Sequence, residues 1–177
     1  IAPSNSAPLA PTSLLTEGQT NPSSITDTTP EFSAIYNGDT GDTANKYQIQ
    51  VDDNSDFSSV YWDSGSSGTS MSDCTEGNRC SDISYAGSTL SRETTYYWRI
   101  KYWDDENTEG AWSTETATFS LAQAEQPTAC RVDPVRDGSN FDITIEWADN
   151  STNETGYELD KKIDAGSWAD LTTVGAG

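Results

Sequence analysis

A row of cationic and aromatic side chains in the middle of the chain is the set best suited to bind a ligand. Residues 94–104 alternate in polarity, so a strand there has one apolar face and one cationic, aromatic face. The second face carries Tyr97, Arg99, Lys101 and Trp103, and outward positions of the alternating segment 46–51 add Lys46, Gln48 and Gln50. Aromatic rings stack on sugar faces and Arg and Gln donate to hydroxyls, so the face could bind a glycan. It could equally be a protein interface, or a solvated face of cross-strand pairs with Lys and Arg stems over rings.

Acidic turns are the second group of residues that could do chemistry. The favoured turn holds Asp104, Asp105, Glu106 and Asn107, the next holds Asp52, Asp53 and Asp56, and a third runs from Asp149 and Asn150 to Asn153 and Glu154. Ca²⁺ takes six to eight oxygen ligands from such groups, so calcium is the one cofactor to consider. The alternative is that Asp and Asn stand there because they favour turns by bonding their own backbone.

Enzymatic chemistry is not expected. The chain contains no His, which excludes Ser-His-Asp and Cys-His catalysis and most zinc sites. Carboxylates are plentiful, but glycoside hydrolysis needs two of them facing each other ~5–9.5 Å apart across a cleft, and acids confined to turns offer no evident cleft.

Composition limits the partners. Nine basic residues stand against 29 acidic ones, a net charge of −20 that repels nucleic acid and anionic membranes. No apolar run is long enough to span a membrane. Only 33% of residues are hydrophobic, but six Trp, eight Tyr and four Phe argue for a folded core and against disorder.

Cysteine usage points to an extracellular location. Cys74 and Cys80 bracket a turn containing Gly77 and Asn78, so a local disulfide is favoured over a metal site. Cys130 is left over, either as a buried free thiol or with a partner outside this sequence. The chain opens on Ile1 without Met, and we expect a piece of a longer exported protein.

The elements that position these residues are strands. Alternating or short apolar segments at 14–16, 31–36, 46–51, 60–63, 83–90, 94–104 and 111–121, with turn signals between them, predict an all-β antiparallel sandwich. The apolar parity Tyr96, Trp98, Ile100 and Tyr102 should fill its core. Residues 1–12 read as a Pro/Ala/Ser linker, 64–79 as a Gly/Ser-rich insertion and 122–127 as a second linker. Residues 128–177 restart the pattern, with Phe141, Ile143, Ile145 and Trp147 expected to point inward.

Residues 13–121 resemble a fibronectin type III-like module of large bacterial cell-surface and carbohydrate-active proteins. The resemblance lies in residues 47–51 (YQIQV), 62–65 (WDSG), 85–87 (YAG), 90–100 and 112–113 (WS). Residues 128–177 resemble the first half of a second module, through 147–157 (WADNSTNETGY). The resemblance implies an immunoglobulin-like sandwich in which the Tyr96 hydroxyl ties its strand to the preceding connection. It also implies a bacterial source and a spacer or binding role.

These observations together predict a non-catalytic structural or adhesion module of an extracellular, cell-surface protein, with neighbouring domains or subunits as partners. One alternative is an accessory carbohydrate-binding module of a glycoside hydrolase. Another is a subunit of a surface filament or array, in which a strand from another chain completes the second module.

Overall fold

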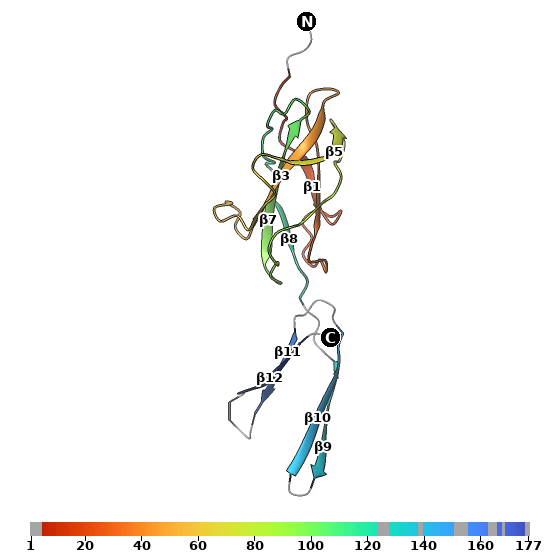
Figure 1. The fold of residues 1–177 in the computed structure, drawn as a ribbon, viewed down its shortest axis with the longest axis vertical. Coiled ribbons are helices and arrows are strands. Elements are labelled where there is room, and N and C mark those ends of the chain that lie inside the picture. The colour runs from red at the N-terminus through yellow and green to blue at the C-terminus, as the bar shows by residue number, and fades with distance from the viewer. Residues whose placement is uncertain are drawn as a thin grey trace. The chain divides into compact units, whose positions relative to one another are not determined.

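The chain forms two compact units, residues 1–122 (unit 1) and residues 123–177 (unit 2). The computed structural model describes residues 5–123, 128–137, 140–150, 156–162, 166–167 and 169–175. All of its regular elements are strands, numbered in chain order, and Figure 1 labels those for which there is room. In this described part, no helix is long and apolar enough to cross a membrane.

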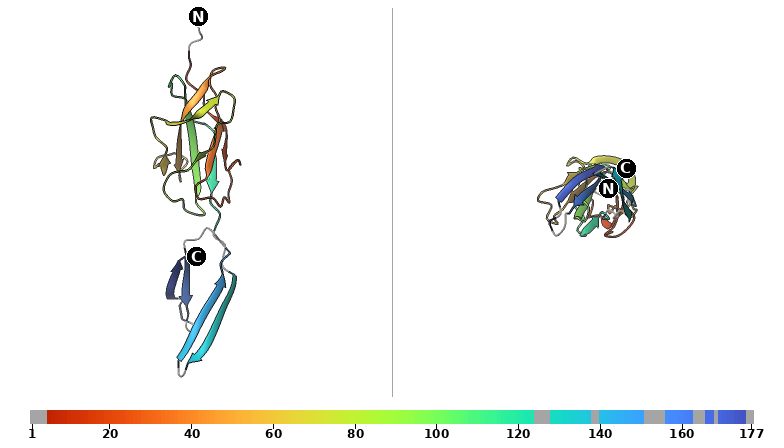
Figure 2. Two further views of the ribbon diagram at one scale, coloured as in Figure 1. Left: turned by 45° about the vertical axis from the view of Figure 1, so that its right-hand side comes forward. Right: turned by 90° about the horizontal axis from the view of Figure 1, so that it is seen from below.

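Unit 1 is a sandwich of two antiparallel sheets. The smaller sheet has the order β1 (Thr12–Thr16), β2 (Glu31–Ile35) and β6 (Ile83–Ser84). The larger has the order β4 (Trp62–Asp63), β3 (Thr43–Asp52), β7 (Thr95–Asp104) and β8 (Ala117–Ser120), and β5 (Thr69–Thr75) also pairs with β3. Figure 2 shows green β7 running lengthwise through unit 1 beside teal β8. The predicted all-β, immunoglobulin-like sandwich is therefore confirmed.

The core lies between these sheets and is filled by aromatic rings. Its largest members include Tyr96, Trp98, Ile100 and Tyr102, each no more than 1% exposed, as the alternation predicted. Phe32 of β2 reaches across from the smaller sheet, with its ring centroid 4.7 Å from that of Trp98. A buried aromatic side chain removes ~150–250 Å² from water, so a few rings stabilise a sandwich whose composition is otherwise polar.

Tyr96 also makes the bond that the resemblance implied. Its hydroxyl oxygen accepts a hydrogen bond from the Ser91 amide at 2.8 Å, which ties β7 to the connection before it. The ring packs between Phe119 and Tyr61, with centroid distances of 5.4 and 5.5 Å.

Two parts of unit 1 differ from the expectation. Residues 5–12 do not stand apart as a linker, because the Leu9 amide donates to the Asn37 carbonyl at 2.8 Å and the Ala111 amide donates to the Pro8 carbonyl at 3.1 Å. The insertion at residues 64–79 contains β5, a strand with little apolar pattern. The Cys74–Cys80 disulfide, with Cα atoms 5.3 Å apart, lies at its end as predicted.

Unit 2 consists of two separate antiparallel hairpins. One pairs β9 (Thr128–Asp137) with β10 (Asn140–Ala148), and the other pairs β11 (Gly156–Lys161) with β12 (Ala169–Gly175). The expectation that Ile143 points into a core is wrong, because its side chain is 62% exposed.

Two further expectations fall on unit 2. Cys130 is exposed and has no disulfide partner among the described residues, so it is not a buried thiol. Asn153 and Glu154 of the third acidic turn lie outside the described residues.

Candidate functional site

The pairing of β3 with β7 brings the predicted cationic and aromatic residues side by side. In the register of these strands Lys46 lies opposite Trp103, Gln48 opposite Lys101, and Gln50 opposite Arg99. Directly opposed residues of an antiparallel pair share one face of the sheet. We call this set, together with Tyr97, the ladder face.

Cations and rings alternate along the ladder face. The Arg99 guanidinium lies 4.3 Å from the ring centroid of Phe57 and 4.5 Å from that of Trp112. The Lys101 ammonium lies 4.6 Å from the Trp112 centroid and 4.9 Å from that of Trp103. Such contacts stabilise a fold by ~0.5–1 kcal/mol each when exposed and more when water is excluded. Phe57 and Trp112 come from turns, and the sequence pattern did not assign them to this face.

Hydrogen bonds link the polar side chains of the ladder face, although Gln48 Oε1 is buried without a partner among the described residues. The side-chain oxygen Oε1 of Gln50 accepts from Nε and Nη2 of Arg99 at 2.9 and 2.6 Å, and Lys101 is ion-paired with Glu109. The side-chain Nε2 groups of Gln48 and Gln50 each donate a hydrogen bond to the Asp63 carboxylate at 2.7 Å.

These contacts set the charge states of the face. Burial opposes ionisation of Asp63, but the hydrogen bonds from Gln50, Gln48 and the Gly65 amide outweigh it, so the pKa of Asp63 lies below its usual value. Burial lowers the pKa of Arg99, an effect opposed by the negative charge of Asp63. Arg99 remains a cation because the ordinary pKa of its guanidinium lies far above neutral pH.

Part of the ladder face is covered by the chain itself. Trp103 is 4% exposed, Lys101 8% and Gln48 2%. The segment that leads into β5 approaches closely at Gly68, which has a φ of +79° and where a Cβ would lie 3.1 Å from the Trp103 ring. The residues that stay half-exposed at the other end of the strand are Tyr97 and Arg99.

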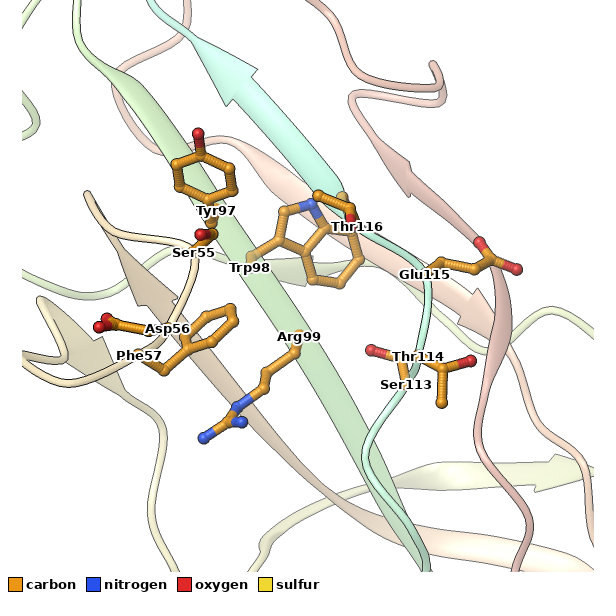
Figure 3. Close-up of a pocket in the computed structure, with 11 residues that line it drawn as sticks. Ser55, Asp56, Phe57, Tyr97, Trp98, Arg99, Ser113, Thr114, Glu115 and Thr116 are labelled. Carbon is orange, nitrogen blue, oxygen red and sulfur yellow. The ribbon is translucent and has the colours of Figure 1, made fainter.

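A pocket of about 230 Å³ opens at that half-exposed end (Figure 3). Trp98 pairs with Ala117, but the next link from β7 is made by Ser113, whose amide donates to the Ile100 carbonyl at 2.8 Å. Residues 114–116 therefore loop out of the pairing and form one wall of the pocket. Phe57, Tyr97 and Arg99 form the opposite wall.

Phe57 reaches this wall through a strained backbone. Its φ is +53°, in the left-handed region that bulky residues rarely adopt. Strain of this kind costs ~1–3 kcal/mol and gathers at functional sites.

The carboxylates at the pocket do not form a catalytic pair. Glu115 accepts hydrogen bonds from the amides of Ser13 and Leu14 at 2.9 and 3.2 Å, so both of its oxygens are engaged with β1. A hydrogen bond from the Ser58 side chain, followed by the one from the Ser58 amide at 3.0 Å, lowers the pKa of Asp56.

The acidic turn at residues 104–107 divides into two pairs of side chains, Asp105 with Glu106 and Asp104 with Asn107. Asp105 and Glu106 come together with Asp42, all three carboxylates offering an oxygen within 4.8 Å of the others. A hydrogen bond with Asp105, followed by slight burial and the Asp105 charge, raises the pKa of Glu106. Asp104 is buried and accepts from the Thr108 amide at 2.6 Å and from Asn5 at 2.8 Å, while Asn107 accepts from Lys46.

The second acidic turn bonds to its own backbone. Asp52 is buried and accepts from the amides of Asn54 and Ser59 at 3.3 and 3.2 Å. Asp53 accepts from the Asn54 side chain at 2.7 Å. These bonds are the turn-forming role that Asp and Asn commonly have.

Comparisons with known proteins agree on the fold of unit 1. Residues 11–125 match the family model of the Rha78A-like, N-terminal immunoglobulin domain. The structure of alpha-L-rhamnosidase from Dictyoglumus thermophilum is similar with a TM-score of 0.54 at 19% identity, covering 80% of this chain and 17% of that one. The alpha-L-rhamnosidase of Streptomyces avermitilis, solved with L-rhamnose, gives a TM-score of 0.52 at 22% identity, covering 64% of this chain and 10% of that one. No curated protein matches significantly.

Proposed function

Because the chain belongs to the family of Rha78A-like N-terminal immunoglobulin domains, we propose that it is a non-catalytic accessory part of an extracellular glycoside hydrolase. Its role is to space and support neighbouring domains. The observation that carries this proposal is the internal pairing of the cations of the ladder face, in which Arg99 and Lys101 are already bound by rings, Gln50 and Glu109 of the same chain. Such a face rigidifies a module without needing a ligand.

Several features support the proposal without depending on the ladder. The order of strands in the two sheets is compatible with the fibronectin type III-like relationship that the residues imply. The Cys74–Cys80 disulfide fits an oxidising, extracellular location. The chain spans 17% and 10% of the two rhamnosidases it resembles, a share that fits one module of a larger protein.

Two assays test the accessory role. The isolated chain should not release nitrophenol from p-nitrophenyl α-L-rhamnopyranoside, and turnover by the purified chain would contradict a non-catalytic role. Deleting unit 1 from the longer protein should lower its thermal midpoint or its yield, while turnover per folded molecule should stay unchanged. A deletion with no effect on either midpoint or yield would remove the supporting role.

A second candidate is assembly through unit 2, favoured by its exposed apolar strand residues. Val132, Val135 and Ile143 are 58%, 60% and 62% exposed on β9 and β10. Apolar strands that lack a covering layer commonly pair with strands of another chain. Sedimentation velocity should then show concentration-dependent association that Ile143→Lys weakens. Leu9→Lys, at a 68% exposed position of unit 1, is the matched control, and a monomer at all concentrations would contradict assembly.

A further inference from the structure

We propose that the pocket formed by Phe57, Tyr97, Arg99 and residues 113–116 is a subsite for one neutral pyranose ring. The inference is independent of the accessory role, because a module that only spaces its neighbours needs no such subsite. The pocket exists because β8 departs from β7 between the Trp98–Ala117 pair and the Ser113–Ile100 bond. A regular continuation of the pairing would close the space that this looped segment opens.

The size of the pocket selects a small ligand. Its volume is about 230 Å³, below the ~300–1,000 Å³ of sites that take drug-sized molecules. One wall carries the rings of Phe57 and Tyr97, and the other carries the side chains of the looped segment (Figure 3). A single sugar ring offers the same two surfaces, an apolar face of C–H groups and an edge of hydroxyls.

The polar groups of the pocket match hydroxyls. Arg99 has two of its guanidinium nitrogens bound to the side-chain oxygen of Gln50, which fixes the plane of the group beside the pocket. Ser113 accepts from the Ile100 amide at 3.2 Å, so its hydroxyl hydrogen remains able to donate. Thr114 and Thr116 add two more hydroxyls that both donate and accept.

Charge argues for a neutral ligand. The pocket holds one cation, Arg99, and two carboxylates, Asp56 and Glu115, in a chain of net charge −20. An acidic sugar or an acidic peptide would meet net repulsion, whereas a neutral polyol keeps the bonds without that cost. The wall is also preorganised, since Arg99 is held between Phe57 and Trp112 before any ligand arrives.

The test is an NMR titration of the ¹⁵N-labelled full chain with methyl glycosides of L-rhamnose, D-galactose and D-glucose. We expect at least one of them to give saturable shifts centred on the amides of residues 97–99 and 113–116. The same titration is repeated with two negatively charged probes, glucuronate and a Glu-containing tripeptide. Shifts that saturate only with a charged probe, or with none of the three glycosides, would overturn the proposal.

Variants locate the binding. Tyr97→Ala and Thr114→Val should each weaken the affinity about ten-fold or more, while Thr40→Val, at an exposed position outside the pocket, should leave it unchanged. Thr114→Val keeps the test decisive if Tyr97→Ala does not fold, because Thr114 lies in the exposed looped segment. Saturable shifts that Thr114→Val leaves unaltered would place the sugar elsewhere and overturn the assignment.

Discussion

The two units contain strands of the same alternating kind, yet among the described residues the buried hydrophobic core belongs to unit 1. In unit 1, Trp98 and Ile100 are 1% and 0% exposed because Phe32 and its sheet cover them. In unit 2, Ile143 belongs to an equally regular alternation on β10 and is 62% exposed. Alternation therefore sets which side chains share a face, and a second layer decides whether that face is buried.

The same rule holds on the outer side of unit 1. There the outward-facing residues of β7 became partly buried, because the segment before β5 lies against Trp103 at Gly68, and Trp112 and Glu109 contact Lys101. A face that sequence alone marks as solvated can thus be buried by an insertion. The half-exposed pocket at Tyr97 is the part of the ladder face that this cover does not reach.

The largest expected effect comes from removing the covered ring. Trp98→Ala should destabilise unit 1 by ~3–5 kcal/mol, since it leaves a cavity beneath Phe32. Ile143→Ala on β10 should change stability by less than ~0.5 kcal/mol, as an exposed substitution does. Urea unfolding followed by Trp fluorescence and circular dichroism measures both. Comparable losses in the two variants would mean that unit 2 buries Ile143 in solution.

The covering segment can be tested at Gly68, with Gly41, a glycine outside the segment, as the matched control. Gly68→Ala should cost ~1–2 kcal/mol for the left-handed backbone, and a further ~1–3 kcal/mol because the new Cβ would press on Trp103 and Lys46. Gly41 has a similar φ of +85°, but a Cβ added there would have no atom within 4 Å. Gly41→Ala should therefore cost only the ~1–2 kcal/mol of the left-handed backbone. The difference between their unfolding free energies measures the cover alone. Equal losses would show that the segment does not press on the ladder face.

How far the sequence could go follows from these residues. The alternation around Trp98 correctly predicted which side of the strand is buried, because alternate residues of a strand share one face and here only one face is apolar. β5 was missed because Met71 and Cys74 are its only apolar residues, and its pairing with β3 is a tertiary event. Phe57 and Trp112 were missed as ladder members for the same reason, since they reach Arg99 from distant turns.

The disulfide gives the next largest effect. A Cys74→Ser, Cys80→Ser double variant should lose ~2 kcal/mol, less than the ~3 kcal/mol of a 15-residue loop, because the bridge closes a separation of only 6 residues. Cys130→Ser in unit 2 is the control and should be neutral, as Cys130 is exposed and unbridged in the described structure. Thermal midpoints with and without reductant give the comparison. A reductant-sensitive midpoint in the double variant would reveal a different pairing.

Calcium should distinguish the acidic clusters of the two units. Asp42, Asp105 and Glu106 are held by the sandwich, whereas Glu158, Asp160 and Asp170 lie on the exposed hairpin of β11 and β12. If the first cluster binds Ca²⁺, the ion at ten times its Kd should stabilise unit 1 by ~1.4 kcal/mol relative to chelator.

The variants for this test are matched in charge. Asp105→Asn should abolish the calcium response and Asp160→Asn should not. A midpoint that is the same in calcium and in chelator would remove the proposed site.

The smallest expected effect is a shift of the stability optimum of unit 1 toward mildly acidic pH. Hydrogen bonding to a second carboxyl group is the leading cause that raises the pKa of Glu31 and Glu106 above their usual 4.5. The folded state therefore holds these protons more tightly than the unfolded state, so stability rises as pH falls through the folded pKa values and is fully gained below 4.5. The pKa of Asp63 is lowered instead, so its contribution is present above 3.8 and lost as pH falls through its folded value.

Thermal scans between neutral pH and about pH 4 should accordingly show a maximum on the acid side of neutrality. Glu106→Gln removes one of the two raised groups and should flatten the rise. Ile143→Ala should leave the pH profile unchanged, because it alters only unit 2. A midpoint that falls steadily from neutral pH downward would show that the lowered group and other carboxylates outweigh the repulsion at Glu31 and Glu106.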